Sequence, residues 1–148
     1  TLYLYYAWLT PVAWETRLAT AVSNSENWPS TIKVYGKLFT RHSPVEDTMD
    51  IKYADDIGKF IAVSTGEKWS DKNYVVVRES TDGINFKITD KIGVSLNFQP
   101  YSHSLGITGT ANGHMLVSGD NYLSYCYGST WGKWSLYFQP IKFYEVEG

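Results

Sequence analysis

The fold of this chain is decided by residues 48–92, which read TMDIKYADDIGKFIAVSTGEKWSDKNYVVVRESTDGINFKITDKI. Four short apolar runs, at residues 49–53, 59–64, 74–78 and 86–92, are separated by polar segments rich in turn-forming residues. The pair Asp82-Gly83 lies between two of these runs. Asp-Gly between β-rich segments is a strong hairpin signal, because a primed turn needs positive φ at its centre. We therefore predict four antiparallel strands here, which is about the content of one β-propeller blade.

The segments on either side repeat the order of this central unit in less complete form. We expect strands at residues 2–8, 15–22 and 31–39, the first of them buried on both faces, and these match the last three strands of the central unit at a spacing of about 57 residues. Residues 103–110 and 121–128 match its first two strands, and residues 135–146 form one long strand or two interrupted at Pro140. The prediction is an all-β chain with propeller blades at about residues 1–44, 45–94 and 95–148.

Three blades do not close a propeller, since about four to eight are needed for a ring without open edges. The first blade also lacks its innermost strand in this interpretation. We expect either that a second chain completes the ring or that the residues belong to a longer polypeptide, because the sequence starts at Thr1 without an initiator Met or a signal-peptide pattern. A closed β-barrel or a β-sandwich is the structural alternative, although it explains the repeat less well.

Composition excludes several classes of partner. The chain has 148 residues and a formal net charge of -2, so nothing favours nucleic acid or an anionic membrane surface. No apolar run approaches the roughly 18 residues needed to cross a bilayer. A lone cysteine, Cys126, excludes an internal disulfide framework and leaves the compartment unassigned. We predict neither a nucleic-acid partner nor a membrane partner.

Aromatic residues are unusually frequent. The six Trp, twelve Tyr and six Phe make up 16% of the chain, and no long segment has helical periodicity. This excess indicates an all-β fold. It also suits a carbohydrate-binding surface, where flat rings cover the apolar faces of sugar rings. The alternative for any single aromatic is cross-strand packing in the core.

Three sets of phrases carry a family resemblance: LYLYYAW…RLATAVSNSENW, DIKYADDIGKF…RESTDGINF and HSLGITG…NGH…YLSYCYG…WGKW. They resemble the five-bladed β-propeller glycoside hydrolases, a clan of arabinanase/β-xylosidase-like and levansucrase-like enzymes. The resemblance implies a hydrolase-like propeller that acts on or binds a polysaccharide or oligosaccharide, secreted or periplasmic, and it allows a central cation such as calcium. The alternatives are a non-catalytic, lectin-like propeller and a scaffold protein whose blade edges pair with another chain.

Members of this clan use carboxylates that project from the inner strands into a central cavity, and glycoside hydrolysis needs two of them. Asp50 is the residue that matches this position, as a base or as a carboxylate that tunes a pKa. Alternation places Asp50 and Lys52 on one face of the strand, with Lys52 close enough to keep Asp50 ionised. The alternative is an aspartate that binds backbone N–H groups at the start of a strand. The second carboxylate is unassigned, with Glu15, Glu46, Asp47 and Glu79 as the residues considered.

We expect four residues to bind substrate: His103, Trp131, Tyr53 and Arg78. His103 precedes a glycine-rich inner strand, where the clan often has a histidine that binds sugar or a cation, and His114 is the second choice. Trp131 and Trp134 belong to the motif WGKW, which forms either a sugar platform or a plug between blades. Arg78 and Arg17 occupy matching places in the repeat, either to bind a carboxylate or sugar hydroxyls or to cap a contact between blades. No metal site is predicted, because the three histidines have no zinc-type spacing.

Overall fold

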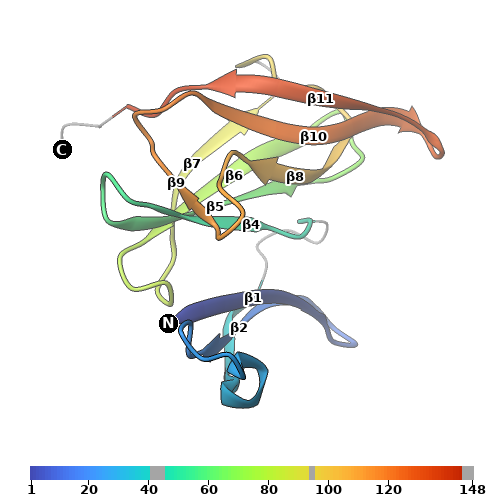
Figure 1. Cartoon of the computed structure of the whole chain (residues 1–148). Helices are drawn as coiled ribbons and strands as arrows, with labels where there is room; N and C mark the ends of the chain where they lie inside the picture. The colour runs from blue at the N-terminus through green and yellow to red at the C-terminus, as the bar shows by residue number, and fades with distance from the viewer. Residues whose placement is uncertain (41–45, 94–95, 145–148) are drawn as a thin grey trace.

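The computed structural model describes residues 1–40, 46–93 and 96–144, and the regular secondary structure of this part of the chain is almost entirely β-strand (Figure 1). The strands are β1 (Leu2–Leu9), β2 (Trp14–Ala21), β3 (Lys33–Thr40), β4 (Asp50–Ala54), β5 (Lys59–Gly66), β6 (Tyr74–Ser80), β7 (Lys87–Gly93), β8 (Ser102–Ile107), β9 (His114–Met115), β10 (Asn121–Thr130) and β11 (Lys133–Ile141). A short 3-10 helix, η1 (Trp28–Thr31), precedes β3. The all-β prediction is confirmed. No helix within the described ranges has the length and apolar character needed to cross a membrane.

The strands form three sheets. The first sheet has the order β1-β2-β3, the middle sheet β7-β6-β5-β4-β9 and the third sheet β11-β10-β8. All neighbours are antiparallel except β4 and β9. Figure 1 shows the first sheet at the bottom, the middle sheet above it, and β10 and β11 at the top. Within the described residues none of the sheets closes on itself.

The segment that predicted a four-stranded unit forms β4 to β7, paired in sequence order. Its central strand β5 is buried on both faces from Ile61 onward, because the middle sheet lies between the other two. The outer strand β7 is instead exposed and charged, with Lys87, Asp90 and Lys91 along it. Charged side chains on an edge strand oppose pairing with other chains.

Two kinds of contact hold the sheets together. The middle and third sheets share one hydrophobic core, made of Ala54, Ile61, Val63, Val75, Phe98, Leu105, Ile107, Met115, Leu123 and Tyr125. The first sheet meets the middle sheet through aromatic rings: the ring centroids of Tyr3 and Phe60 lie 5.0 Å apart, and those of Phe39 and Phe86 lie 6.0 Å apart. The first sheet is therefore attached by an aromatic seam.

Two local expectations differ from the structure, and of the two alternatives left open for the last strand the structure has the uninterrupted one. The first strand is not buried on both faces: Trp8 and Leu9 are exposed, because aromatic contacts to the middle sheet come from Tyr3 and Tyr5 nearer its start. The two-residue strand β9 was not predicted, since two residues carry no periodicity. Strand β11 runs through Pro140 without interruption. It is an edge strand, where a residue without an N–H is tolerated, and residues 145–146 of the expected strand lie outside the described ranges.

Candidate functional site

Four rings from three separate segments form a surface that we call the aromatic site: Trp69, His103, Trp131 and Trp134. Trp69 follows β5, His103 lies at the start of β8, and the two other tryptophans belong to the β10–β11 hairpin. The His103 and Trp134 centroids are 4.3 Å apart, and those of Trp131 and Trp134 are 4.8 Å apart. Trp69 closes the group, 5.7 Å from His103 and 5.8 Å from Trp131. The structure thus brings together two of the predicted binding residues, His103 and Trp131.

The tryptophans of this site face solvent. Trp131 is 77% exposed, Trp69 44% and Trp134 38%. Exposed tryptophans that touch one another are unusual, because such rings gain most by burial. Clustered exposed apolar side chains mark a binding surface more often than single ones do.

The backbone that carries the aromatic site is strained. Five non-glycine residues of the described chain have positive φ, and Glu67, Trp69, Tyr101 and Ser104 are four of them. The left-handed conformation costs an ordinary residue about 1–2 kcal/mol. Hydrogen bonds between the two segments hold it, since the N–H of Tyr101 donates to the Ser70 carbonyl at 2.8 Å and the N–H of Trp69 to the Ser102 carbonyl at 3.3 Å. Strain of this kind is concentrated at functional sites.

His103 is buried behind the tryptophans, with 5% of its surface exposed. Burial lowers the pKa of its imidazole and outweighs the opposite effect of the nearby Asp47 carboxylate. The ring is therefore neutral at pH 7. Its Nδ1 is buried and makes no hydrogen bond with the described residues. An unsatisfied buried nitrogen is rare enough to need an explanation, and a binding role is one.

Lys68 and Asp47 form the charged border of the aromatic site. The Lys68 Nζ lies 3.3 Å from the Asp47 Oδ1 and 4.6 Å from the centroid of the Trp69 ring. Burial alone would raise the pKa of the Asp47 carboxyl, but the N–H groups of Ser104 and Thr48, together with Lys68, hold it below its usual range. Asp47 is therefore a permanent carboxylate at neutral pH.

The predicted catalytic residue Asp50 lies at the seam between β4 and β8. Its Oδ1 is 2.5 Å from the Lys52 Nζ, and its Oδ2 accepts a hydrogen bond of 3.0 Å from the N–H of Ile107. The expected proximity of Lys52 is thus present. The contact expected from the alternative interpretation is also present, because Asp50 accepts a hydrogen bond from a backbone N–H group of β8. Asp47 contacts the same strand three residues earlier, at the N–H of Ser104.

The other carboxylates considered as partners of Asp50 are engaged in ion pairs. Glu46 pairs with Arg78, Glu15 with Arg17, and Glu79 with Lys59. Of the four candidates, the remaining one, Asp47, contacts β8, which is the strand that Asp50 also contacts.

Arg78 and Tyr53 lie away from the aromatic site. Arg78 is 4% exposed and enclosed by Glu46, Ser64 and the ring of Phe39. It makes the carboxylate contact that was one of its two expected roles, inside the protein. Tyr53 instead lines a cleft of about 720 Å³ between the first and middle sheets.

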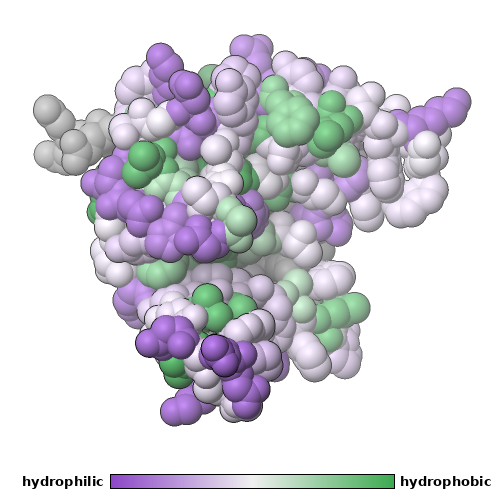
Figure 2. Space-filling view, in the orientation of Figure 1, coloured by the Kyte–Doolittle hydropathy of each residue, from purple (hydrophilic) through white to green (hydrophobic). Residues whose placement is uncertain are grey.

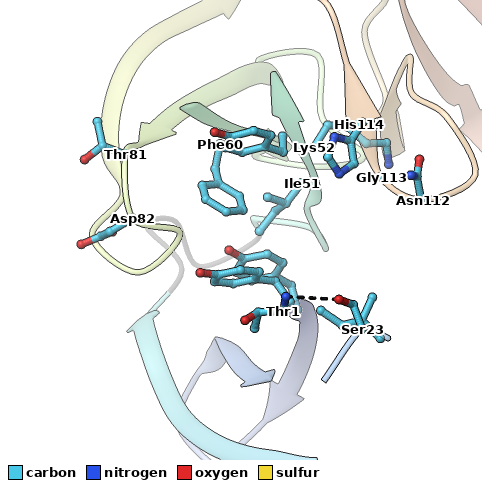
Figure 3. Close-up of a pocket in the computed structure, with 14 residues that line it drawn as sticks. Thr1, Ser23, Ile51, Lys52, Phe60, Thr81, Asp82, Asn112, Gly113 and His114 are labelled. Atoms are coloured by element: carbon cyan, nitrogen blue, oxygen red, sulfur yellow. Dashed lines mark hydrogen bonds between the residues drawn. The ribbon is translucent and has the colours of Figure 1, made fainter. Parts of the chain in front are cut away.

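Figure 3 shows this cleft, with Ile51 and Phe60 pointing from the middle sheet toward the first. Its remaining lining residues are Thr1, Leu2, Tyr3, Tyr5, Ser23, Lys52, Tyr53, Thr81, Asp82, Asn112, Gly113 and His114. His114 stands at the border, with its Nδ1 2.8 Å from the Asp55 carboxylate and its ring 5.6 Å from that of Tyr53. The space-filling view shows the surface hollowed between the two sheets (Figure 2).

Sequence analysis missed Trp69. The residue lies in a polar loop with a left-handed backbone conformation, and its ring contacts those of Trp131 and His103. No sequence signal identifies a tryptophan in that conformation. The described residues include no group of three His, Cys, Asp or Glu side chains placed to hold a metal ion. A central cation, which the family resemblance allows, thus has no donor set of this kind, and we derive no chemistry from it.

Comparisons with models of protein families, with curated proteins and with solved structures gave no significant match. Function is therefore inferred from the geometry of this chain.

Proposed function

We propose that this protein binds an oligosaccharide or polysaccharide at the aromatic site. The observation that supports the proposal best is the convergence of three exposed tryptophans and a buried neutral histidine from three chain segments. Indole rings offer flat apolar area to the C–H faces of a sugar ring, with little loss of conformational freedom on binding. Lys68 and Asp47 at the border supply the polar groups that fix the orientation of a ligand.

We further propose that the three sheets are blades of a β-propeller, completed by structure beyond this chain. Three features support this. The sheets follow one another in chain order except for the two-residue strand β9, the order β1-β2-β3 repeats β5-β6-β7, and β8-β10-β11 repeats β4-β5-β6. In addition, the first strands of two successive units, β4 and β8, are in contact through Asp50 and Ile107.

Binding without hydrolysis is the better-supported activity. A glycosidase needs one carboxyl group protonated to serve as the acid. Asp47 is held ionised by three donors, and both oxygens of Asp50 are engaged by Lys52 and Ile107. The hydrolase that the family resemblance implies would have to release Asp50 from these contacts. If the protein cleaves a polysaccharide and the conservative variant Asp50→Asn abolishes cleavage while remaining folded, the hydrolase is the correct interpretation.

The test of binding is affinity electrophoresis through gels that contain neutral plant polysaccharides, chiefly arabinan, xylan and glucan, followed by calorimetry with the matching oligosaccharide. We expect retardation by at least one polysaccharide. Replacing Trp131 with alanine should weaken binding about tenfold, which corresponds to about 1.4 kcal/mol. Trp28→Ala is the matched control, because Trp28 is a partly exposed tryptophan in the 3-10 helix of the first sheet. Equal binding by the Trp131 and Trp28 variants, or no binding by the unmodified protein, contradicts the proposal.

A further inference from the structure

The first sheet lacks a strand that the other two sheets possess. In the repeat, β1 corresponds to β5 and β10. Strand β5 has β4 along one edge and β6 along the other, and β10 lies between β8 and β11. Strand β1 pairs with β2, and its other edge pairs with no strand of the described chain. The N–H and C=O groups along such an edge are a template for a further strand.

The cleft lies beside this open position. Leu2, Tyr3 and Tyr5 of β1 line one side, and Ile51 and Tyr53 of β4 line the other. At the corresponding place between the middle and third sheets, β8 pairs with β10 and donates backbone N–H groups to Asp50 of β4 and to Asp47, which precedes β4. A strand in the cleft would be placed as β8 is. It would pair with β1, as β8 pairs with β10, and it would pack against β4.

The charged groups of the cleft are each held by neighbouring residues. Lys52 pairs with Asp50, and His114 with Asp55. The Asp82 carboxylate accepts hydrogen bonds from the N–H groups of Ile84 and Asn85, and these bonds lower its pKa. Apart from the Asp82 carboxylate and the Thr1 ammonium, the cleft presents aromatic side chains and a backbone edge. This combination fits an extended peptide with apolar side chains better than it fits a charged small molecule.

We propose that the cleft is the docking site for an extended strand of a partner polypeptide, which adds to the free edge of β1. The partner strand resembles β4 in pattern, with apolar side chains alternating toward Phe60 and the tyrosines of β1. This inference does not depend on sugar binding, since the aromatic site lies on the loop after β5, the start of β8 and the β10–β11 hairpin.

The probe is a synthetic peptide with the sequence of residues 48–54, TMDIKYA, which contains the strand that pairs with β5 in the middle sheet. We expect saturable binding with a dissociation constant below about 1 mM. The titration is monitored by NMR of the ¹⁵N-labelled protein. Alternate β1 amides should become protected from hydrogen exchange, while the amides of the β3 edge should not. The control peptide has proline in place of the residues equivalent to Lys52 and Ala54, which removes two N–H donors on the edge that faces β5 in the middle sheet. It should bind at least tenfold more weakly.

Two variants of the protein test whether the peptide binds in the cleft. Tyr3→Asp should weaken peptide binding about tenfold, and Tyr35→Asp, on the exposed surface of β3, should leave it unchanged. If Tyr3→Asp does not fold, the proline peptide on the unmodified protein decides the question. Equal binding of both peptides, no binding up to about 1 mM, or binding without protection of β1 overturns the proposal. Shifts at the cleft caused by a neutral oligosaccharide, with no response to peptide, also overturn it. Loss of sugar binding in the Trp131→Ala variant has no bearing on this result.

Discussion

Arg78 binds Glu46 through both guanidinium branches inside the protein. Its Nη1 lies 2.5 Å from the Glu46 Oε1 and its Nη2 lies 3.1 Å from the Oε2, while the Phe39 ring lies 5.0 Å from the guanidinium carbon. Glu46 begins the segment that enters the middle sheet, and Phe39 belongs to the first sheet. Arg78 of the middle sheet thus contacts the first sheet through Phe39 and is buried between Phe39 and Glu46, although it was expected to bind substrate.

Replacing Arg78 with alanine should destabilise the fold by about 3–5 kcal/mol, because the buried Glu46 carboxylate would lose the cation that balances it. The matched control is Arg17→Ala, at the corresponding place of the repeat. Arg17 pairs with Glu15 but its side chain is 29% exposed, so we expect a loss of about 1 kcal/mol. Urea unfolding measures both values. Similar losses for the two variants would show that the buried pair has no special role.

The repeat at the level of strands could be predicted from the sequence, because it depends on local signals. Asp82-Gly83 fixed the turn between β6 and β7, and alternating apolar runs located the flanking strands. The relation between β4 and β8 could not be predicted, since it depends on hydrogen bonds between residues 57 positions apart, from Ile107 to Asp50 and from Ser104 to Asp47.

For the candidate site, the chemical type of a residue could be read from the sequence, but its burial and its partners could not. His103 and Trp131 were selected as a histidine and a tryptophan near glycines, and both lie at the aromatic site. Arg78 was selected on equal grounds and is buried against Glu46. A single sequence does not tell which arginine has a carboxylate brought to it from another segment.

Stability should decrease as the pH falls below about 6.5. Burial lowers the pKa of His103 from its ordinary value of 6.5, so between the lowered value and 6.5 the unfolded chain binds a proton that the folded chain does not. Asp47 stays ionised through this window, because its own pKa lies below 3.8. Urea unfolding at pH 7.5, 6.5 and 5.5 measures the slope.

The His103→Gln variant should lose most of this slope. An unchanged slope in the His103 variant would assign the pH dependence to another group.

Ser104→Gly should stabilise the protein by up to about 1 kcal/mol. Ser104 has a φ of 54°, which glycine adopts without the steric penalty of a side chain, and its N–H bond to Asp47 is kept. Ser104→Val should destabilise it by at least about 1 kcal/mol, because a β-branched residue is the least compatible with this region. Thermal unfolding of the two variants checks the opposite signs. Destabilisation by glycine would show that the serine side chain contributes more than the strain costs.

Gly128 limits how the β10–β11 hairpin closes beneath the tryptophans. A Cβ on Gly128 would collide with the Lys133 carbonyl oxygen and lie 3.1 Å from the Trp134 indole. Gly128→Ala should therefore cost about 1–3 kcal/mol and displace Trp134, because a backbone oxygen cannot rotate away as a side chain does. Tryptophan fluorescence should change together with the unfolding midpoint. Gly93→Ala is the control, since no atom of the described residues lies within 4 Å of a Cβ there and the expected effect is close to zero. A Gly128 variant that keeps its stability but loses sugar binding would place the constraint in the geometry of the aromatic site and leave the fold unaffected.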